Sequence, residues 1–145
     1  MTDQPAENGP GCERPDQAPG AGKGCPFCRG ELRAAAIARH GTVFAVPDAR
    51  PVSEGHALII TLRHTPDFFT MTEGEHRDAN ELLRMLRDRA LREDPEITGF
   101  NVGSNCGESA GQRIPHAHIH FIPRREPDAP EGRGVKGVIR NKIDY

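Results

Sequence analysis

The stretch that decides the fold is His116-Ala117-His118-Ile119-His120-Phe121-Ile122, in which three histidines alternate with apolar residues. Successive side chains of a strand point to opposite faces, so the three imidazoles are predicted to share one face, with Ala117, Ile119 and Phe121 on the other. The apolar face belongs in a core. The other face is a row of titratable rings, spaced roughly 6.5–7 Å apart along the strand, which suits metal ligation or chemistry on a phosphate held between two rings.

A loop of small residues precedes the histidine row and favours phosphoryl chemistry. Gly107 and Gly111 allow the backbone to approach an anion closely, and the amides of Asn105 and Gln112 donate hydrogen bonds to phosphoryl oxygens without adding charge. A neutral imidazole attacks phosphorus well near pH 7, and a second imidazole on the same face donates a hydrogen bond or a proton. A metal-dependent β-fold enzyme with all three histidines as ligands is the alternative, but it gains nothing from such a loop.

Composition limits the classes of partner. The chain of 145 residues fits one domain, while 35% hydrophobic residues, 16 Gly and 13 Pro indicate that part of it does not fold. Residues 1–24 are polar and rich in Pro and Gly, so we expect a disordered tail there and a folded domain over 25–145. A net charge of −2 favours neither nucleic acid nor a membrane surface as a partner. Without a membrane-length apolar run or a secretory pattern, we expect a cytoplasmic protein.

Cys25-Pro26-Phe27-Cys28 opens the predicted domain and forms half of a tetrahedral zinc site, because two intervening residues let both thiolates reach one ion. The redox interpretation needs a thioredoxin-like context that the following residues do not supply. The two further ligands are expected to be histidines, with Cys106 as a competitor. Two unligated thiols capping the domain are the alternative. Cys12 is interpreted as an incidental free thiol in the tail.

The remaining pattern predicts several strands and one long helix. A capping box at Thr72 and Glu75 begins a helix that runs to about Arg92, with one apolar stripe for a sheet and its charges on a solvated face. Further strands are predicted, in order, at residues 33–38, 42–46, 55–62 and 98–103. The continuous apolar run at 57–60 predicts a strand buried on both faces. Together these elements predict an α+β fold with a mostly antiparallel sheet.

The histidine row resembles the signature of the histidine triad (HIT) family, in which His, an apolar residue, His, an apolar residue, His and two apolar residues follow one another. The resemblance covers residues 25–145. Within the family, the sequence resembles the bacterial-type branch and the diadenosine polyphosphate hydrolases. It is carried further by residues 25–28, 51–56, 105–112, 123–125 and 134–140. It implies an antiparallel sheet of about five strands covered by one long helix, with the sheet continued across a homodimer.

The resemblance also implies an activity. His118 would attack the α-phosphate of an adenine-type nucleotide and form a covalent nucleotidyl-histidine, with His120 contacting the phosphate and leaving group and His56 beside the site. Such a hydrolase or transferase acts on dinucleoside polyphosphates or nucleoside phosphoramidates. A nucleotide-binding module with incidental slow turnover is the alternative from another class.

Other residues follow from the same resemblance. Asp48 falls where the family holds the ribose hydroxyls, and Asn105 falls where an amide contacts phosphate. Arg113 stands where the best-known branches carry Ser or Thr, which leaves the handling of the leaving group open. Residues 134–145 are expected to reach toward the partner's site in a dimer.

In zinc-bearing branches that resemble this sequence, the C-x-x-C joins two histidines. Here these four ligands are Cys25, Cys28, His64 and His116. Such a closed site would make zinc structural and leave His118 and His120 for chemistry, so no catalytic metal is expected.

Overall fold

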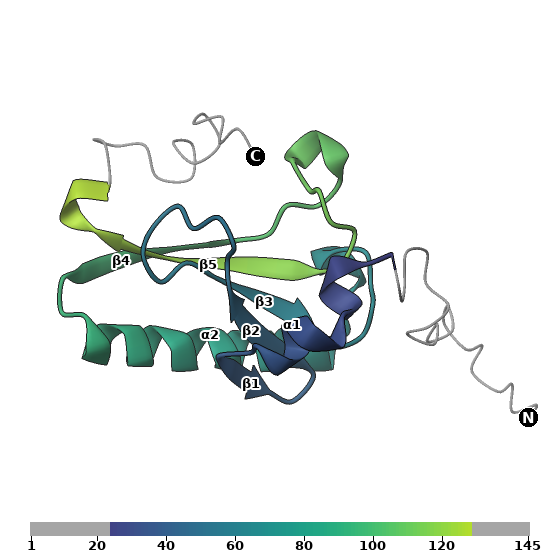
Figure 1. The fold of residues 1–145 in the computed structure, drawn as a ribbon, viewed down its shortest axis with the longest axis horizontal. Coiled ribbons are helices and arrows are strands. Elements are labelled where there is room, and N and C mark those ends of the chain that lie inside the picture. The colour runs from purple at the N-terminus through teal and green to yellow at the C-terminus, as the bar shows by residue number, and fades with distance from the viewer. Residues whose placement is uncertain (1–23, 129–145) are drawn as a thin grey trace, which may run out of the picture.

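A computed structural model describes residues 24–128. Apart from Gly24, the predicted tail lies outside the described residues, as does the segment 134–145. A five-stranded sheet in the order β1-β2-β3-β5-β4 has one long helix, α2, packed along one face, as Figure 1 shows. Its strands are β1 (Ala38–His40), β2 (Val43–Pro47), β3 (Ala57–Thr61), β4 (Ile97–Gly103) and β5 (His118–Arg125). Every pairing is antiparallel, which confirms the predicted α+β architecture.

The histidine strand β5 lies between β3 and β4, and the predicted alternation holds for His118 and His120, whereas His116 precedes the strand. Ala117, Ile119 and Phe121 are buried in the core under α2, together with alternate residues of β2 and β3. On the opposite face Ile60 pairs with His118 and Leu58 with His120. Because β3 is apolar on both faces, it contributes to this core and to a second one beneath the N-terminal segment, as the run at 57–60 predicts.

Helix α2 (Glu73–Glu93) begins at the predicted capping box, in which Thr72 Oγ1 accepts from the backbone N–H of Glu75 at 3.1 Å. The apolar stripe packs on the sheet with Ala79, Leu82 and Leu86 buried. The predicted solvated face is wrong for Glu75, which is 3% exposed and accepts from Arg63 at 2.7 Å. Glu75 caps the helix and also pairs with Arg63 of the preceding loop. Its carboxylate is therefore held inside the structure and not on the solvated face.

The predicted strand at 33–38 is wrong. Residues Gly30–Ala34 form the short helix α1, which follows the 3-10 turn η1 (Pro26–Cys28), and only Ala38–His40 is extended. The alanine-rich run Ala34-Ala35-Ala36 favours helix, and Ala35 N–H donates to Glu31 O at 3.1 Å. Arg33 then holds the turn to the sheet by donating to Leu62 O at 2.6 Å.

Two further 3-10 turns flank the site, η2 (Phe68–Thr70) and η3 (Glu108–Ala110), and a fourth, η4 (Glu126–Asp128), follows β5. None of the helices in the described part of the chain is long and apolar enough to cross a membrane.

Candidate nucleotidyl-transfer site and metal cluster

His118 and His120 lie on the wall of a cavity of about 290 Å³, on the face of the sheet opposite α2. Asp48, Asn105 and Gly111 lie on the same wall, so the fold brings five of the predicted catalytic and substrate-binding residues together. The rest of the wall is largely apolar and includes Phe27, Leu32, Val46, Leu58 and Ile114. A mostly apolar hollow with a few convergent polar groups is the usual form of a small-molecule site.

The tautomer of His118 follows from its hydrogen bond. Its Nδ1 lies 2.7 Å from the carbonyl oxygen of His116. A carbonyl only accepts, so Nδ1 carries the hydrogen and the lone pair of the neutral ring is on Nε2. Burial lowers the pKa of His118 below its ordinary value of 6.5 and outweighs the hydrogen bond to His116 and the charge of Asp48, which raise it. The ring therefore presents a neutral nucleophilic nitrogen at pH 7.

A hydrogen-bonded chain assigns the hydrogen of His120 as well. The backbone N–H of Val52 donates to Nδ1 of His56 at 3.2 Å, so His56 carries its hydrogen on Nε2. That group donates to Nδ1 of His120 at 2.9 Å, which leaves His120 with an Nε2–H. His120 thus offers a donor in the cavity where His118 offers a lone pair.

Asp48 lies behind this histidine chain. One carboxylate oxygen is 3.4 Å from Nε2 of His56 and 3.8 Å from Nδ1 of His120. Burial lowers the pKa of His120 to about 4, and repulsion from the protonated forms of His118 and His56 acts in the same direction. The carboxylate of Asp48 raises the pKa but does not offset these effects. Burial is also the largest cause of the lowered pKa of His56. Both rings are neutral at pH 7, and an anion bound beside them would draw their pKa values upward.

Gln112 does not lie on the cavity wall with the other predicted residues. Its Nε2 donates to Pro66 O at 2.7 Å and to Ile114 O at 3.0 Å, and its Oε1 accepts from the N–H of Gly107 at 2.8 Å. The side chain braces the loop in which Gly107 and Gly111 both adopt φ of +89°. Its predicted direct contact with substrate phosphate stays a prediction.

Sequence reasoning missed two polar residues at the site, Ser104 and Arg50, and named Arg113 without giving it a role. Ser104 Oγ donates to His118 O at 2.7 Å and ties β5 to the preceding loop. Arg50 and Arg113 lie on the cavity wall and bring positive charge to it. Arg113 stood out in sequence as a departure from the family pattern, whereas nothing local distinguished Arg50 from other loop arginines.

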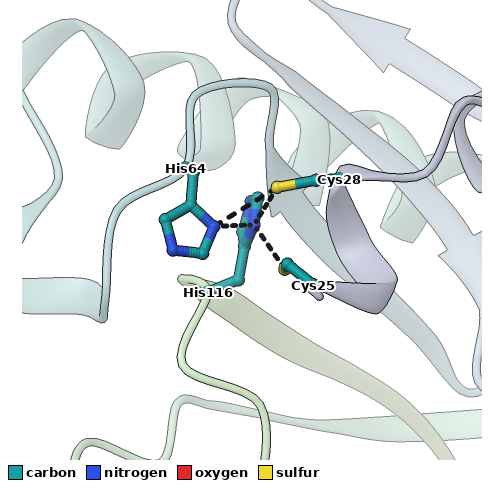
Figure 2. Close-up of side chains that lie close together, drawn as sticks. All are labelled: Cys25, Cys28, His64 and His116. Atoms are coloured by element: carbon teal, nitrogen blue, oxygen red, sulfur yellow. Dashed lines mark hydrogen bonds between the residues drawn. The ribbon is translucent and has the colours of Figure 1, made fainter. Parts of the chain in front are cut away.

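The four predicted metal ligands, Cys25, Cys28, His64 and His116, lie close together, as Figure 2 shows, and none of them lines the cavity. Cys25 Sγ lies 3.4 Å and Cys28 Sγ 3.5 Å from Nδ1 of His116. Cys28 Sγ is 3.3 Å and His116 Nδ1 is 3.2 Å from Nδ1 of His64. A tetrahedral ion with Zn–S bonds of about 2.3 Å and Zn–N bonds of about 2.0–2.1 Å separates S and N ligands by about 3.5 Å and two N ligands by about 3.3 Å. The donor set fits zinc.

The surroundings of His116 support the same fit. Its Nε2 lies 2.7 Å from Thr61 O, so the hydrogen is on Nε2 and the Nδ1 lone pair faces the thiols. Burial lowers its pKa to about 4, which keeps the ring neutral and able to ligate. The three histidines of the row do not converge on one ion, because His116 groups with the cysteines while His120 groups with His56 and Asp48. This arrangement counts against the metal-dependent alternative.

Comparisons with known proteins agree with the fold. The HIT domain family model matches residues 29–127, and the chain belongs to the HIT family. It is 30% identical over 118 residues to adenosine 5'-monophosphoramidase HNT1 of Candida albicans, covering 77% of this chain and 76% of that protein. It is 31% identical over 87 residues to the bis(5'-nucleosyl)-tetraphosphatase of Schizosaccharomyces pombe, covering 60% of this chain and 47% of that protein. The crystal structure of a HIT family protein from Bacillus anthracis superposes with a TM-score of 0.66 at 28% identity, covering 73% and 77%.

Proposed function

We propose that this protein is a nucleotidyl hydrolase or transferase that attacks the α-phosphate of adenine-type nucleotides through His118. The observation that carries the proposal is the pairing of a lone pair on His118 Nε2 with an N–H on His120 Nε2 in one cavity. The two relatives named for phosphoramidase and tetraphosphatase activity support the reaction class, since both substrates are cleaved at a phosphorus that carries a nucleoside.

In this mechanism His118 Nε2 attacks the α-phosphorus, a P–N bond forms and the bond to the leaving group breaks. Throughout this step His118 keeps its hydrogen on Nδ1, which donates to the carbonyl oxygen of His116. This hydrogen bond stabilises the positive charge that develops on the ring. His120 Nε2–H and the amide of Asn105 donate to the phosphoryl oxygens. Water then attacks the same phosphorus, the P–N bond breaks, and the proton of that water passes to solvent as the nucleoside monophosphate leaves. Asp48 is placed to accept from ribose hydroxyls.

The leaving group we propose is a polyphosphate. A cavity of about 290 Å³ lies at the lower end of ligand-site volumes, so it accommodates one nucleotide unit and leaves the rest of a dinucleotide at the rim. Arg50 and Arg113 lie on the cavity wall. A polyphosphate departs as an anion and needs positive charge more than a proton, which arginine supplies in a fork that matches phosphate oxygens.

We further propose that Cys25, Cys28, His64 and His116 hold a structural zinc ion. The ligand separations, the lone pair of His116 directed at the thiols and the absence of all four residues from the cavity wall support this assignment. When bound, the ion joins the N-terminal segment to the loops that precede α2 and β5. Zinc analysis of the purified protein tests it, with one ion per chain expected and none expected in Cys28→Ser.

The partner we propose is a second copy of the chain, joined through β4. Among residues 24–128, β4 pairs on one side only, which leaves a row of backbone groups for a neighbouring strand. Val102 is 50% exposed and Phe69 80% exposed, and both line a groove of about 680 Å³ beside that edge. Val102→Asp should therefore yield a monomer in sedimentation experiments. Ile37→Asp, an exposed position next to the opposite edge strand, should not, and equal dissociation of both variants would contradict the β4 interface.

Intact-protein mass spectrometry after rapid quenching tests the reaction itself. Wild-type protein mixed with a diadenosine polyphosphate should gain the mass of one nucleoside monophosphate less one water. His118→Ala should not gain it, while His40→Ala, which removes a histidine that pairs with Glu81 outside the cavity, should behave as wild type. Nucleotide binding without adduct or product in the wild type would instead indicate a nucleotide-binding module.

A further inference from the structure

Phe27 is the one side chain of the Cys25-Pro26-Phe27-Cys28 turn that contacts the proposed nucleophile. It is 7% exposed, and its ring centroid lies 5.1 Å from that of His118, with an interplanar angle of 82°. It also meets His116 at 5.9 Å and 76°. The same residue lies on the cavity wall. Phe27 therefore lies between two cysteines of the metal cluster and against the ring that is proposed to attack phosphorus.

Two ring contacts act on His118 beside its hydrogen bond to His116. Its Nδ1–H bond to His116 O holds one edge, but a single hydrogen bond allows the ring to rock about that contact. His120 meets it edge-on at 5.4 Å and 66° on one side, and Phe27 meets it on another. Edge-to-face contacts between aromatic rings have a preferred geometry, so these two neighbours together define the plane of the His118 ring.

The position of Phe27 depends in turn on the two cysteines that flank it. Within the turn, Cys28 N–H donates to Cys25 O at 3.2 Å, a contact that closes the turn but does not attach it to the sheet. Packing of Cys25 and Phe27 in the second core and the contacts between the thiols and the imidazoles of His64 and His116 make that attachment. These histidines lie on the loops that lead out of β3 and into β5, so a metal bound by the four residues fixes the turn relative to the strand of His118.

We infer that Phe27 is a positioning residue that links the metal cluster to catalysis: the turn held by Cys25 and Cys28 presses the Phe27 ring against His118 and keeps Nε2 directed at the substrate. The inference rests on the proposed function for its catalytic consequence. Its structural part, the restraint of the His118 ring, does not depend on turnover.

Nitrogen NMR of the His118 ring in zinc-loaded protein tests the structural part. The wild type should show one neutral tautomer, with hydrogen on Nδ1. Phe27→Ala should show averaged shifts from both tautomers while still binding one zinc per chain. Phe27→Leu keeps apolar volume in case the alanine variant fails to fold, and should show partial averaging. Leu62→Ala is the matched control, because Leu62 packs against the same core but does not line the cavity. An unchanged single tautomer in both Phe27 variants overturns the inference.

Single-turnover kinetics with a diadenosine polyphosphate test the catalytic part. We expect Phe27→Ala to slow adduct formation at saturating substrate by about tenfold or more, which is about 1.4 kcal/mol in the barrier. Leu62→Ala should leave both binding and that step unchanged. Removing zinc from the wild type should give the same tautomer averaging that Phe27→Ala shows. Removing zinc from Phe27→Ala should slow adduct formation no further. If Phe27→Ala loses affinity and keeps the rate of adduct formation, the inference is refuted. If the wild type forms no adduct, the proposed function is refuted, and the tautomer measurement alone decides whether Phe27 restrains the His118 ring.

Discussion

Lowering the pH should destabilise the fold through His120, by an amount that follows from its burial. The side chain is 19% exposed and its pKa in the folded protein is about 4, against 6.5 for an ordinary imidazole. Below pH 6.5 the unfolded chain takes up a proton that the folded chain does not. The stability that His120 provides is therefore complete above pH 6.5 and is lost as the pH falls toward 4.

The size of the effect follows from the two pKa values. Their difference corresponds to about 3 kcal/mol in full, of which about 2 kcal/mol is lost between pH 8 and pH 5. Other groups titrate in the same range, including the metal ligands, so the wild type alone does not isolate His120. His120→Asn is the matched control, because its side-chain oxygen can still accept from Nε2–H of His56 in place of Nδ1.

Urea unfolding of zinc-loaded wild type and His120→Asn at pH 8, 7, 6 and 5 measures the difference. We expect the wild type to lose about 2 kcal/mol more than the variant over this range, with most of the divergence below pH 6.5. Parallel stability curves for the two proteins would mean that the folded protein accommodates a charged His120, and would refute the argument from burial.

Three further predictions concern the leaving group, the metal and the core. Arg113→Ser should slow the covalent step about tenfold with a diadenosine polyphosphate but not with a phosphoramidate whose amine carries no negative charge, as single-turnover assays of both substrates would show. Cys28→Ser should bind no zinc and unfold at a lower temperature in calorimetry, because the ion no longer joins its loops. Leu82→Ala, at a side chain that is 0% exposed, should cost about 2–5 kcal/mol in urea unfolding, against less than about 1 kcal/mol for Leu91→Ala, which is 39% exposed on the same helix.

Local patterns determined much of the fold before any contact was known. Alternation with period two placed His118 and His120 on one face of a strand and their apolar partners on the other, although His116 lies before the strand and turns to the cysteines. The stripe of α2 and its capping box placed the long helix in the same way. The local pattern was insufficient at residues 30–38, where packing of Leu32 and the Arg33 hydrogen bond to Leu62 select a short helix instead of a strand.

Only the tertiary structure decided how the site works. The hydrogens on His56 and His120 follow from a contact between residues 64 positions apart, and the metal cluster joins Cys25 to His116 across 91 positions. Residue types and spacing nominate such groups, but tautomers, lowered pKa values and the contact of Phe27 with His118 arise from burial and orientation. Those are properties of neighbours that are distant in the chain. The sequence therefore named the candidate groups, and the packing of the sheet determined which ring nitrogens carry a hydrogen and which carry a lone pair.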